Sequence, residues 1–372
     1  MLVTPCDPGN CHIYFGVQLR ALPTAVALAR HLRRTLVLPP FEWYDNQAQD
    51  FVNSFRTTPA GRLPRFTPWS SLFDREALRA GGIDALDLAD AQIETIDRAF
   101  LHTSARPGAA ASPQSITSDE RLCKPRRDGI LANLTWDSEG RAVGAVELYG
   151  QRFSFGVPLR CKEMHLMSAD VVAALESSIG DAPTAAVFNV GHHMQTKLDT
   201  AGAARTLLDR SLRPHPDLDR EAARFVADLL PPAPARHKWV AVHWRHGDYV
   251  AYRLVTPLVQ LAERIHKALS TLDCDPGGAS CSVFLMTNCR NATELSELSA
   301  ALRPTIPVIR YEPTEALFAQ EGVRLVIEQS IASRADLFVN SPRSAVSEYI
   351  DTLRRSSRMQ RKQTPGTPKA EL

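Results

Sequence analysis

Trp239-Val-Ala-Val-His-Trp-Arg-His-Gly-Asp248 is the part of the chain from which the fold class is predicted most directly. Its first six residues form a short apolar run with two β-branched valines, which is typical of a strand buried on both faces. The run then ends in an arginine, a histidine, a glycine and an aspartate. Ligands of open α/β sheets bind beyond the carboxyl ends of the strands. The stretch therefore predicts a buried strand whose end brings Arg245 and Asp248 to a ligand site.

Strand and helix patterns alternate downstream of this stretch. Three more strands are predicted, over 282–287, 308–311 and 336–339. Helices are predicted over 256–269, 291–302, 323–333 and 344–353, the first with Thr256 as N-cap and Pro257 at its first position. The alternation implies a parallel, doubly wound sheet. Its carboxyl edge would collect Arg245, Asn288 and the turn at 340–344.

The residues before this stretch predict another α/β unit. A strand over 1–4, a glycine-containing loop over 8–18, a helix over 19–33 and a strand over 35–38 follow one another. Pro23 would have to lie near the start of that helix, because proline cannot donate a backbone hydrogen bond. A glycine loop before a helix can hold an anion on backbone N–H groups, although this loop matches neither the P-loop nor G-x-G-x-x-G. A hairpin is expected over 144–158 and a strand over 185–190.

The segment Pro231-Pro-Ala-Pro234 is stiff and suits a domain boundary. We therefore predict an N-terminal domain over 1–230, which ends in a helix over 217–230 and carries a mobile loop insertion at about 102–128. A C-terminal domain would occupy 236–355. The basic tail over 356–372 is expected to be disordered.

The bulk composition is that of a soluble globular protein. The chain has 372 residues, 44% of them hydrophobic and 23% charged, which suffices for two domains with cores of their own. The formal net charge of +2 offers no case for a nucleic-acid partner. No apolar run is long enough to predict a membrane span. Met1-Leu-Val-Thr-Pro5 lacks the pattern of a secretory leader, so the protein is cytosolic or the chain is a mature or truncated form.

The seven cysteines leave the redox compartment open. No pair has C-x-x-C spacing, so a zinc site is not expected. Cys6 and Cys11 flank a short loop, and so do Cys274 and Cys281. Disulfides at these two loops would suit an oxidising compartment, and free thiols are the alternative.

Other candidate metal ligands have ordinary explanations. His192-His193 directly follow a predicted strand and are either ligands or strand-end histidines without a ligand. The sequence D-x-D, which chelates a metal in some glycosyltransferases, occurs at 217–219 and 273–275. We interpret the first as a helix start and the second as a loop.

Several segments together resemble the GDP-fucose protein O-fucosyltransferase family. Phe15-Gly-Val-Gln18 and Arg34-Thr-Leu-Val-Leu-Pro-Pro40 are similar to the family's G-R-F-G-N-Q loop and its R-T-L-x-V-P-P strand, with Phe41 as the aromatic that follows. His243-Trp-Arg-His-Gly-Asp248 resembles H-x-R-x-G-D, and Val283-Phe-Leu-Met-Thr-Asn288 resembles V-x-V-A-T-D. Residues 311–314 and 335–340 look like the segments that come next. The matches keep the family's order and leave about 45–230 uncovered.

The resemblance implies an α/β, GT-B-like fold with two Rossmann-like doubly wound domains facing a cleft. It also implies an inverting transfer of fucose from GDP-fucose to a Ser or Thr hydroxyl of a folded protein domain, with no cofactor and no protein-bound metal. Arg245 would stabilise the charge that develops on the departing GDP. The nucleotide-sugar site would comprise Phe15, Gly16, Val17, Gln18, His243, Trp244, Arg245, Asp248, Asn288, Arg343, Ser344, Ala345 and Val346, with Arg245 as the catalytic residue.

Within that site, Asn288 would contact the guanine base and His243 would line the nucleotide pocket. The helix start at 344–346 would offer backbone N–H groups to the phosphates. Two structural alternatives stay open: Arg245 pairs only with Asp248, or His243 is a hydrogen-bonded core histidine.

The sequence also departs from the family pattern. Tyr14 and Val17 replace an arginine and an asparagine of the loop, and Asn288 replaces an aspartate. Ala345 and Val346 replace a serine and a phenylalanine. These changes bear on the acceptor and on activity itself. The alternatives are a GDP-fucose-dependent transferase that acts on a glycan or small molecule, and a non-catalytic relative that binds a nucleotide or a partner protein.

The expected partners are GDP-fucose and a protein acceptor, and the expected oligomeric state is a monomer. The expected location is the lumen of the endoplasmic reticulum or secretory pathway. Lys369-Ala-Glu-Leu372 differs by one residue from the K-D-E-L retrieval signal and so supports this only weakly.

Overall fold

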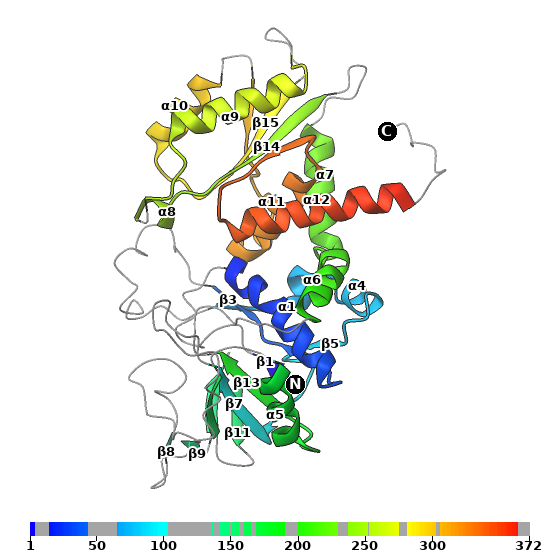
Figure 1. Cartoon of the computed structure of the whole chain (residues 1–372). Coiled ribbons are helices and arrows are strands. Elements are labelled where there is room, and N and C mark those ends of the chain that lie inside the picture. Colours follow the sequence, from blue (N-terminus) through cyan, green and yellow to red (C-terminus); the bar gives the residue numbers. More distant parts are fainter. Residues whose placement is uncertain are drawn as a thin grey trace. The chain divides into compact units, whose positions relative to one another are not determined.

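The structure is a computed structural model of the chain, and it divides into two compact units (Figure 1). One unit comprises Met1–Trp43 and Pro64–Arg213, and the other comprises Tyr44–Leu63 and Pro214–Leu372. The residues that the structure describes are 1–3, 15–43, 65–102, 135–136, 142–143, 145–148, 151–155, 160–164, 169–189, 200–229, 237–251, 253–274, 281–302 and 306–363.

The first unit begins with the predicted strand, helix and strand. These are β1 (Leu2–Val3), α1 (Phe15–His31) and β2 (Leu36–Leu38), and the two strands pair in parallel. The expectation that the helix begins at residue 19 was wrong. Helix α1 starts at Phe15, so Pro23 lies inside it and not near its start. An interior proline costs a helix about 3 kcal/mol. Here the helix is buried on more than one side, at Leu22, Val26 and Leu28, and this burial offsets the cost.

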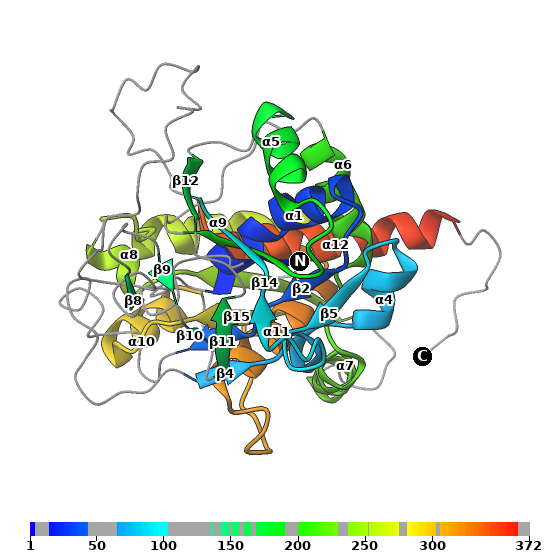
Figure 2. The same cartoon turned by 90° about the horizontal axis from the view of Figure 1, so that it is seen from below.

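The sheet of the first unit has six parallel strands in the order β12-β7-β13-β1-β2-β5. The four strands not yet given are β5 (Ala85–Asp87), β7 (Arg98–His102), β12 (Arg160–Met164) and β13 (Ala185–Asn189), the last as predicted. Helix α6 (Thr200–Ser211) lies against α1, and α4 (Arg75–Ala80) lies against β5 (Figures 1 and 2). The unit also contains α3 (Trp69–Leu72) and α5 (Ala169–Ile179).

Short strands complete the first unit. The predicted hairpin is confirmed as β10 (Ala145–Leu148) and β11 (Gln151–Phe155), and β6 (Thr95–Ile96) pairs with β11 in parallel. Two antiparallel pairs are β3 (Phe41–Trp43) with β4 (Arg65–Thr67) and β8 (Thr135–Trp136) with β9 (Ala142–Val143). Five predicted features lie outside the described residues: the glycine loop before residue 15, the insertion after His102, Cys6 with Cys11, His192-His193 and the proline segment.

The second unit holds the predicted four-stranded parallel sheet, in the order β16-β15-β14-β17. Its strands are β14 (Lys238–Trp244), β15 (Cys281–Thr287), β16 (Val308–Ile309) and β17 (Leu337–Val339). The helices are α7 (Pro216–Leu229), α8 (Asp248–Ala251), α9 (Leu258–Thr271), α10 (Ala292–Ala301), α11 (Glu321–Arg334) and α12 (Ala345–Gln363). Asn291 caps α10 as predicted, since its side chain accepts from the N–H groups of Thr293 and Glu294.

Helices cover both faces of this sheet (Figure 1). Because side chains alternate along a strand, Val240, Val242 and Trp244 face α9 and pack with Ile265 in one buried cluster. The other face of the sheet is covered by α7, α11 and α12, and His243 points toward α12. On that side Phe284 makes edge contacts with Trp239 and with Phe225 of α7, at centroid distances of 6.3 and 5.9 Å.

The division between the units lies before α7, not at residue 230 as predicted. Helix α7 packs on α11 of the second unit. Tyr311 donates a 3.0 Å hydrogen bond to the buried Glu221, and Arg334 forms a 2.8 Å ion pair with Asp219. The helix start predicted at 217–219 is confirmed.

Two other boundaries differ from the prediction. Helix α12 continues to Gln363, so 356–363 are helical and not a disordered tail, and Ser356 is buried. Helix α9 begins one residue later than expected, because Pro257 has an extended ψ of 142° and serves as the N-cap. The carbonyl of Thr256 instead accepts from the Trp244 indole at 3.1 Å.

Of the two cysteine pairs that the sequence left open between disulfide and free thiols, Cys274 and Cys281 form a disulfide, and Cys6 with Cys11 lies outside the described residues. Cys289 in the same unit is a buried free thiol. Within the described residues, every helix is too short or too polar to cross a bilayer.

Candidate functional site

Arg245 stands at the carboxyl end of β14, as the sequence predicts, and its backbone is held by a serine. Its N–H donates to Ser341 Oγ at 2.7 Å, and the same hydroxyl donates to the carbonyl of His243 at 2.7 Å. Ser341 follows β17, so one hydroxyl joins the ends of two neighbouring strands. The guanidinium carbon lies 5.6 Å from the centroid of the Tyr249 ring, within reach of a cation–π contact.

His243 is buried and directed toward α12. Its Nδ1 lies 2.8 Å from Ser347 Oγ, which also accepts a 3.1 Å hydrogen bond from the N–H of Ser341. A serine oxygen can accept two hydrogen bonds and donate one, so this contact fits either neutral tautomer of the imidazole. Burial, with a smaller contribution from the charge of Arg245, lowers the pKa of His243 to about 3. Of the two alternatives for His243, this geometry is that of a neutral, hydrogen-bonded core histidine, and its place in a nucleotide pocket stays a prediction.

This pKa predicts an acid sensitivity that His243 confers on the protein. An unfolded histidine titrates near pH 6.5, so the stabilisation from keeping His243 neutral is complete above that pH and is lost as pH falls from 6.5 toward 3. The loss is about 1.4 kcal/mol per pH unit. Between pH 7 and pH 5, the free energy of unfolding should fall about 2 kcal/mol more in the wild type than in His243→Gln.

Urea unfolding at the two pH values measures this difference. His266→Gln is the matched control, because His266 lies on the surface of α9 and binds the Ala301 carbonyl. Comparison with this variant separates an effect specific to His243 from the effect of removing a histidine elsewhere in the same unit. An equal loss in wild type and His243→Gln would show that His243 is not held neutral by the fold.

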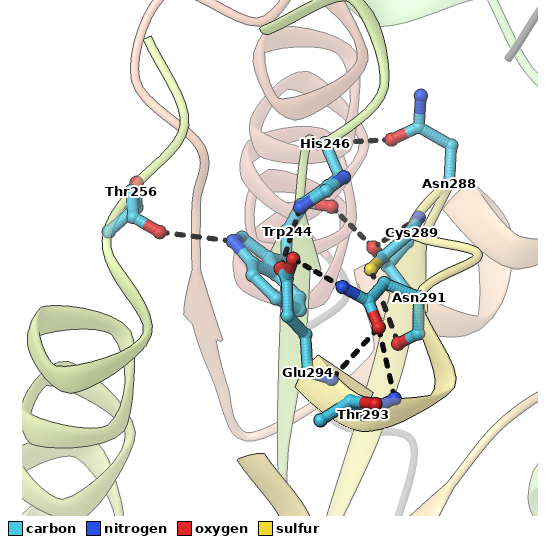
Figure 3. A network of polar contacts seen from close by, with 9 residues as sticks. Trp244, His246, Thr256, Asn288, Cys289, Asn291, Thr293 and Glu294 are labelled. Atoms are coloured by element: carbon cyan, nitrogen blue, oxygen red, sulfur yellow. Dashed lines mark hydrogen bonds and ion pairs between the residues drawn. The ribbon is translucent and has the colours of Figure 1, made fainter. Parts of the chain in front are cut away.

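Asn288 follows β15 and holds the loop after β14. Its Oδ1 accepts a 2.7 Å hydrogen bond from the N–H of His246, and its amide nitrogen points away from this bond (Figure 3). The position of Asn288 at this edge was predicted from the sequence, but its hydrogen bond to the backbone of His246 was not. The expected guanine contact stays a prediction and would use the amide nitrogen or the second lone pair of Oδ1.

The backbone conformation at position 247 explains why the motif has a glycine there. Gly247 has a φ of +53°, a region that side chains with a Cβ rarely enter. The turn closes with hydrogen bonds from the N–H of Tyr249 to His246 O at 2.9 Å and from Val250 to Gly247 O at 3.1 Å. Asp248 is the first residue of α8. Its side chain is not among those that the structure describes, so its pairing with Arg245 stays untested.

The predicted helix start beyond β17 is confirmed as the first turn of α12. Ala345 begins the helix, Val346 and Ser344 are buried, and the exposed Arg343 has a φ of +59°. The Val346 side chain is buried, and the ligand contacts expected of Arg343, Ser344, Ala345 and Val346 stay predictions. What this turn can present to phosphate is backbone N–H groups, as any helix N-terminus does.

The other predicted site residues lie as follows. Trp244 is 1% exposed and packs in the core of the second unit, and its place in the nucleotide-sugar site stays a prediction. Phe15, Gly16 and Val17 form the first turn of α1 in the first unit, and their side chains lie outside the description. Gln18, in the same turn, is buried.

Sequence reasoning missed Ser341 and Ser347. Their place in and just after the turn at 340–344 was the only signal in the sequence. Serine is common in loops, and the hydrogen-bond partners of these two serines are distant in sequence, so neither could be singled out. The residues brought together at this edge are Arg245, His243, Asn288, Ser341 and Ser347.

No family model matches this chain, and no curated protein is significantly similar in sequence. Solved structures are similar. POFUT1 in complex with GDP matches over 96% of each chain, with 18% identity and a TM-score of 0.58. The apo-form of POFUT1 matches over 96% of this chain and 95% of that chain, with 16% identity and a TM-score of 0.60. The chain has the POFUT1 fold. Its class is therefore α/β and GT-B-like, with two Rossmann-like units, as the resemblance implied.

The fucosyltransferase NodZ from Bradyrhizobium also matches, over 94% of this chain and 91% of that chain, with 16% identity and a TM-score of 0.47. POFUT1 has been crystallised with GDP and with GDP-fucose. At these identities the likeness to POFUT1 establishes the fold, and the chemistry has to be argued from the residues of this chain.

Proposed function

We propose that this protein transfers fucose from GDP-fucose to a Ser or Thr hydroxyl of a protein, with inversion at the anomeric carbon. One observation carries the proposal: in a chain with the POFUT1 fold, Arg245 is held by Ser341 at the carboxyl end of a central strand, beside the first turn of α12. This edge of a doubly wound sheet is where nucleotides bind.

The chemistry required of the site is modest. The bond between the anomeric carbon and the diphosphate breaks, and the bonding electrons leave with GDP. A planar, permanently charged guanidinium stabilises that charge through two parallel hydrogen bonds. Backbone N–H groups of the first α12 turn add to this stabilisation. The acceptor oxygen attacks the opposite face of the anomeric carbon, and its proton passes to the departing diphosphate or to solvent. Because Arg245 supplies the positive charge, the proposed transfer has no need of a metal ion or cofactor at the diphosphate.

The proposed setting is the secretory lumen, with the protein acting as a monomer. The disulfide between Cys274 and Cys281 supports this setting, because disulfides persist in oxidising compartments. A glycan acceptor is the second candidate. It is favoured by Val17, which replaces the family's loop asparagine at the start of α1.

Calorimetric titration with GDP, GDP-fucose, GDP-mannose and a UDP-sugar tests the donor. GDP and GDP-fucose should bind and the UDP-sugar should not. Mass spectrometry after incubation with GDP-fucose then tests the acceptor, comparing a folded protein domain with an oligosaccharide. A fucosylated domain supports the first candidate, and a fucosylated oligosaccharide supports the second. Failure of a folded wild-type protein to bind GDP would contradict both.

A further inference from the structure

Three side chains that can ligate a metal ion converge at the ends of β14 and β15 (Figure 3). A ring nitrogen of His246, the sulfur of Cys289 and a carboxylate oxygen of Glu294 all lie within 4.8 Å of one another. His246 follows β14, Cys289 follows β15, and Glu294 lies in the first turn of α10. We propose that these three residues bind a zinc-class divalent ion.

The donor set selects the kind of ion. Thiolate, imidazole and carboxylate together suit zinc, whereas magnesium and calcium prefer oxygen ligands alone. In a tetrahedral zinc site, bonds of about 2.0–2.3 Å place the ligand atoms roughly 3.5 Å apart. The three ligand atoms lie within 4.8 Å of one another, so small side-chain movements would allow all three to coordinate one ion. Three protein ligands leave a fourth position for water.

Two of the three ligands are held by hydrogen bonds from their own backbone N–H groups. The N–H of His246 donates to Asn288 Oδ1 at 2.7 Å, and the N–H of Cys289 donates to Thr287 Oγ1 at 3.0 Å. The Thr287 hydroxyl in turn donates to the carbonyl of Trp244 at 2.7 Å, which joins the two strand ends. A site on such rigid elements loses little conformational entropy when the ion binds.

The surrounding groups also orient the side chains. Asn291 Nδ2 donates to Glu294 Oε1 at 2.8 Å, and the other oxygen, Oε2, faces His246 Nε2 at 2.8 Å. The Trp244 ring packs edge-on against the His246 ring, with centroids 5.1 Å apart. Metal-ligating histidines and carboxylates are commonly held by such neighbours. His246 and Glu294 are 13% and 34% exposed and Cys289 is buried, so the site is shielded on one side and open on the other.

Binding would replace the direct contact between His246 and Glu294 with bonds to the ion. The Cys289 thiol would give its proton to the solvent, since the thiolate is the ligand. The ion would then connect the loop after β14 with the loop after β15. Its effect on the proposed transfer would be indirect, because His246 is the residue after Arg245.

Cobalt(II) titration of the chelator-treated protein tests the site without any sugar nucleotide. We expect one equivalent of cobalt to give a thiolate-to-metal charge-transfer band, and one equivalent of zinc to abolish it. Cys289→Ser should remove the band, and Glu294→Gln should weaken zinc binding by more than about tenfold. Glu297→Gln is the matched control, because Glu297 is exposed on the same helix and outside the cluster.

Circular dichroism verifies that each variant is folded. If Cys289→Ser does not fold, the half-exposed Glu294 still permits the test. The proposal is overturned if the wild type shows no charge-transfer band, or if zinc binds Glu294→Gln as tightly as it binds Glu297→Gln.

Discussion

Arg245→Ala should lower kcat/KM for GDP-fucose by about a hundredfold or more, the largest catalytic effect expected in this protein. The reason is loss of roughly 3 kcal/mol of stabilisation of the charge on the departing diphosphate. Arg245→Lys should recover only part of the rate, because an ammonium keeps the charge but cannot donate two parallel hydrogen bonds. Initial rates of fucose transfer at several GDP-fucose concentrations give kcat/KM for the wild type and for each of the two variants.

The control for this experiment is Arg220→Ala. Arg220 is an exposed residue of α7 that pairs with Asp217 three positions away, so its loss should leave the rate unchanged. The urea midpoint of Arg245→Ala shows whether the variant is folded. Wild-type turnover in a folded Arg245→Ala would remove this residue from the mechanism, and GDP binding by the same variant would show whether the donor site survives.

Arg354→Met should reduce the free energy of unfolding by about 3–5 kcal/mol, the largest stability effect that we expect from one substitution. The Arg354 guanidinium is buried and donates to carbonyls at the end of α11 and the start of β17. Its Nη1 lies 2.6 Å from Ala335 O, with Ala332 O and Ser333 O at 3.3 and 3.4 Å, and its Nη2 lies 3.0 Å from Asp336 O. Methionine fills similar space but cannot donate hydrogen bonds to these carbonyls.

The neighbouring Arg355 provides the comparison. It is exposed and donates to Thr352 Oγ1 at 3.0 Å, so Arg355→Met should cost less than about 1 kcal/mol. Urea denaturation of both variants at one pH measures the difference. Equal stabilities would mean that water replaces the guanidinium and that the connection between α11 and β17 does not depend on Arg354.

The element boundaries show where reasoning from sequence succeeds. The strands β14, β15 and β17 and the N-cap at Asn291 were predicted closely, because unbroken apolar runs and capping residues act over a few neighbours. Helix α7 was assigned to the wrong unit. Nothing in its own sequence says that Phe225 will contact Phe284 or that Glu221 will meet Tyr311.

The candidate site also has parts that the local sequence predicts and parts that it does not. The motif at 243–248 was enough to predict Arg245 at a strand end, and the fold confirms that position. The expectation that zinc is absent came from the lack of C-x-x-C spacing. The cluster of His246, Cys289 and Glu294 has no such spacing, because its members follow two different strands.

Two features could be predicted from local sequence patterns: the parallel α/β sheet of the second half and the position of Arg245 at its carboxyl edge. Local periodicity and turn chemistry suffice for both. Only the tertiary structure decided what holds the site together: Ser341 and Ser347 bind groups of the His243–Arg245 segment that lie 96 to 104 positions away. Hydrogen bonds over such separations depend on how strands pair and helices pack, and a single serine hydroxyl carries no pattern that reveals its partner.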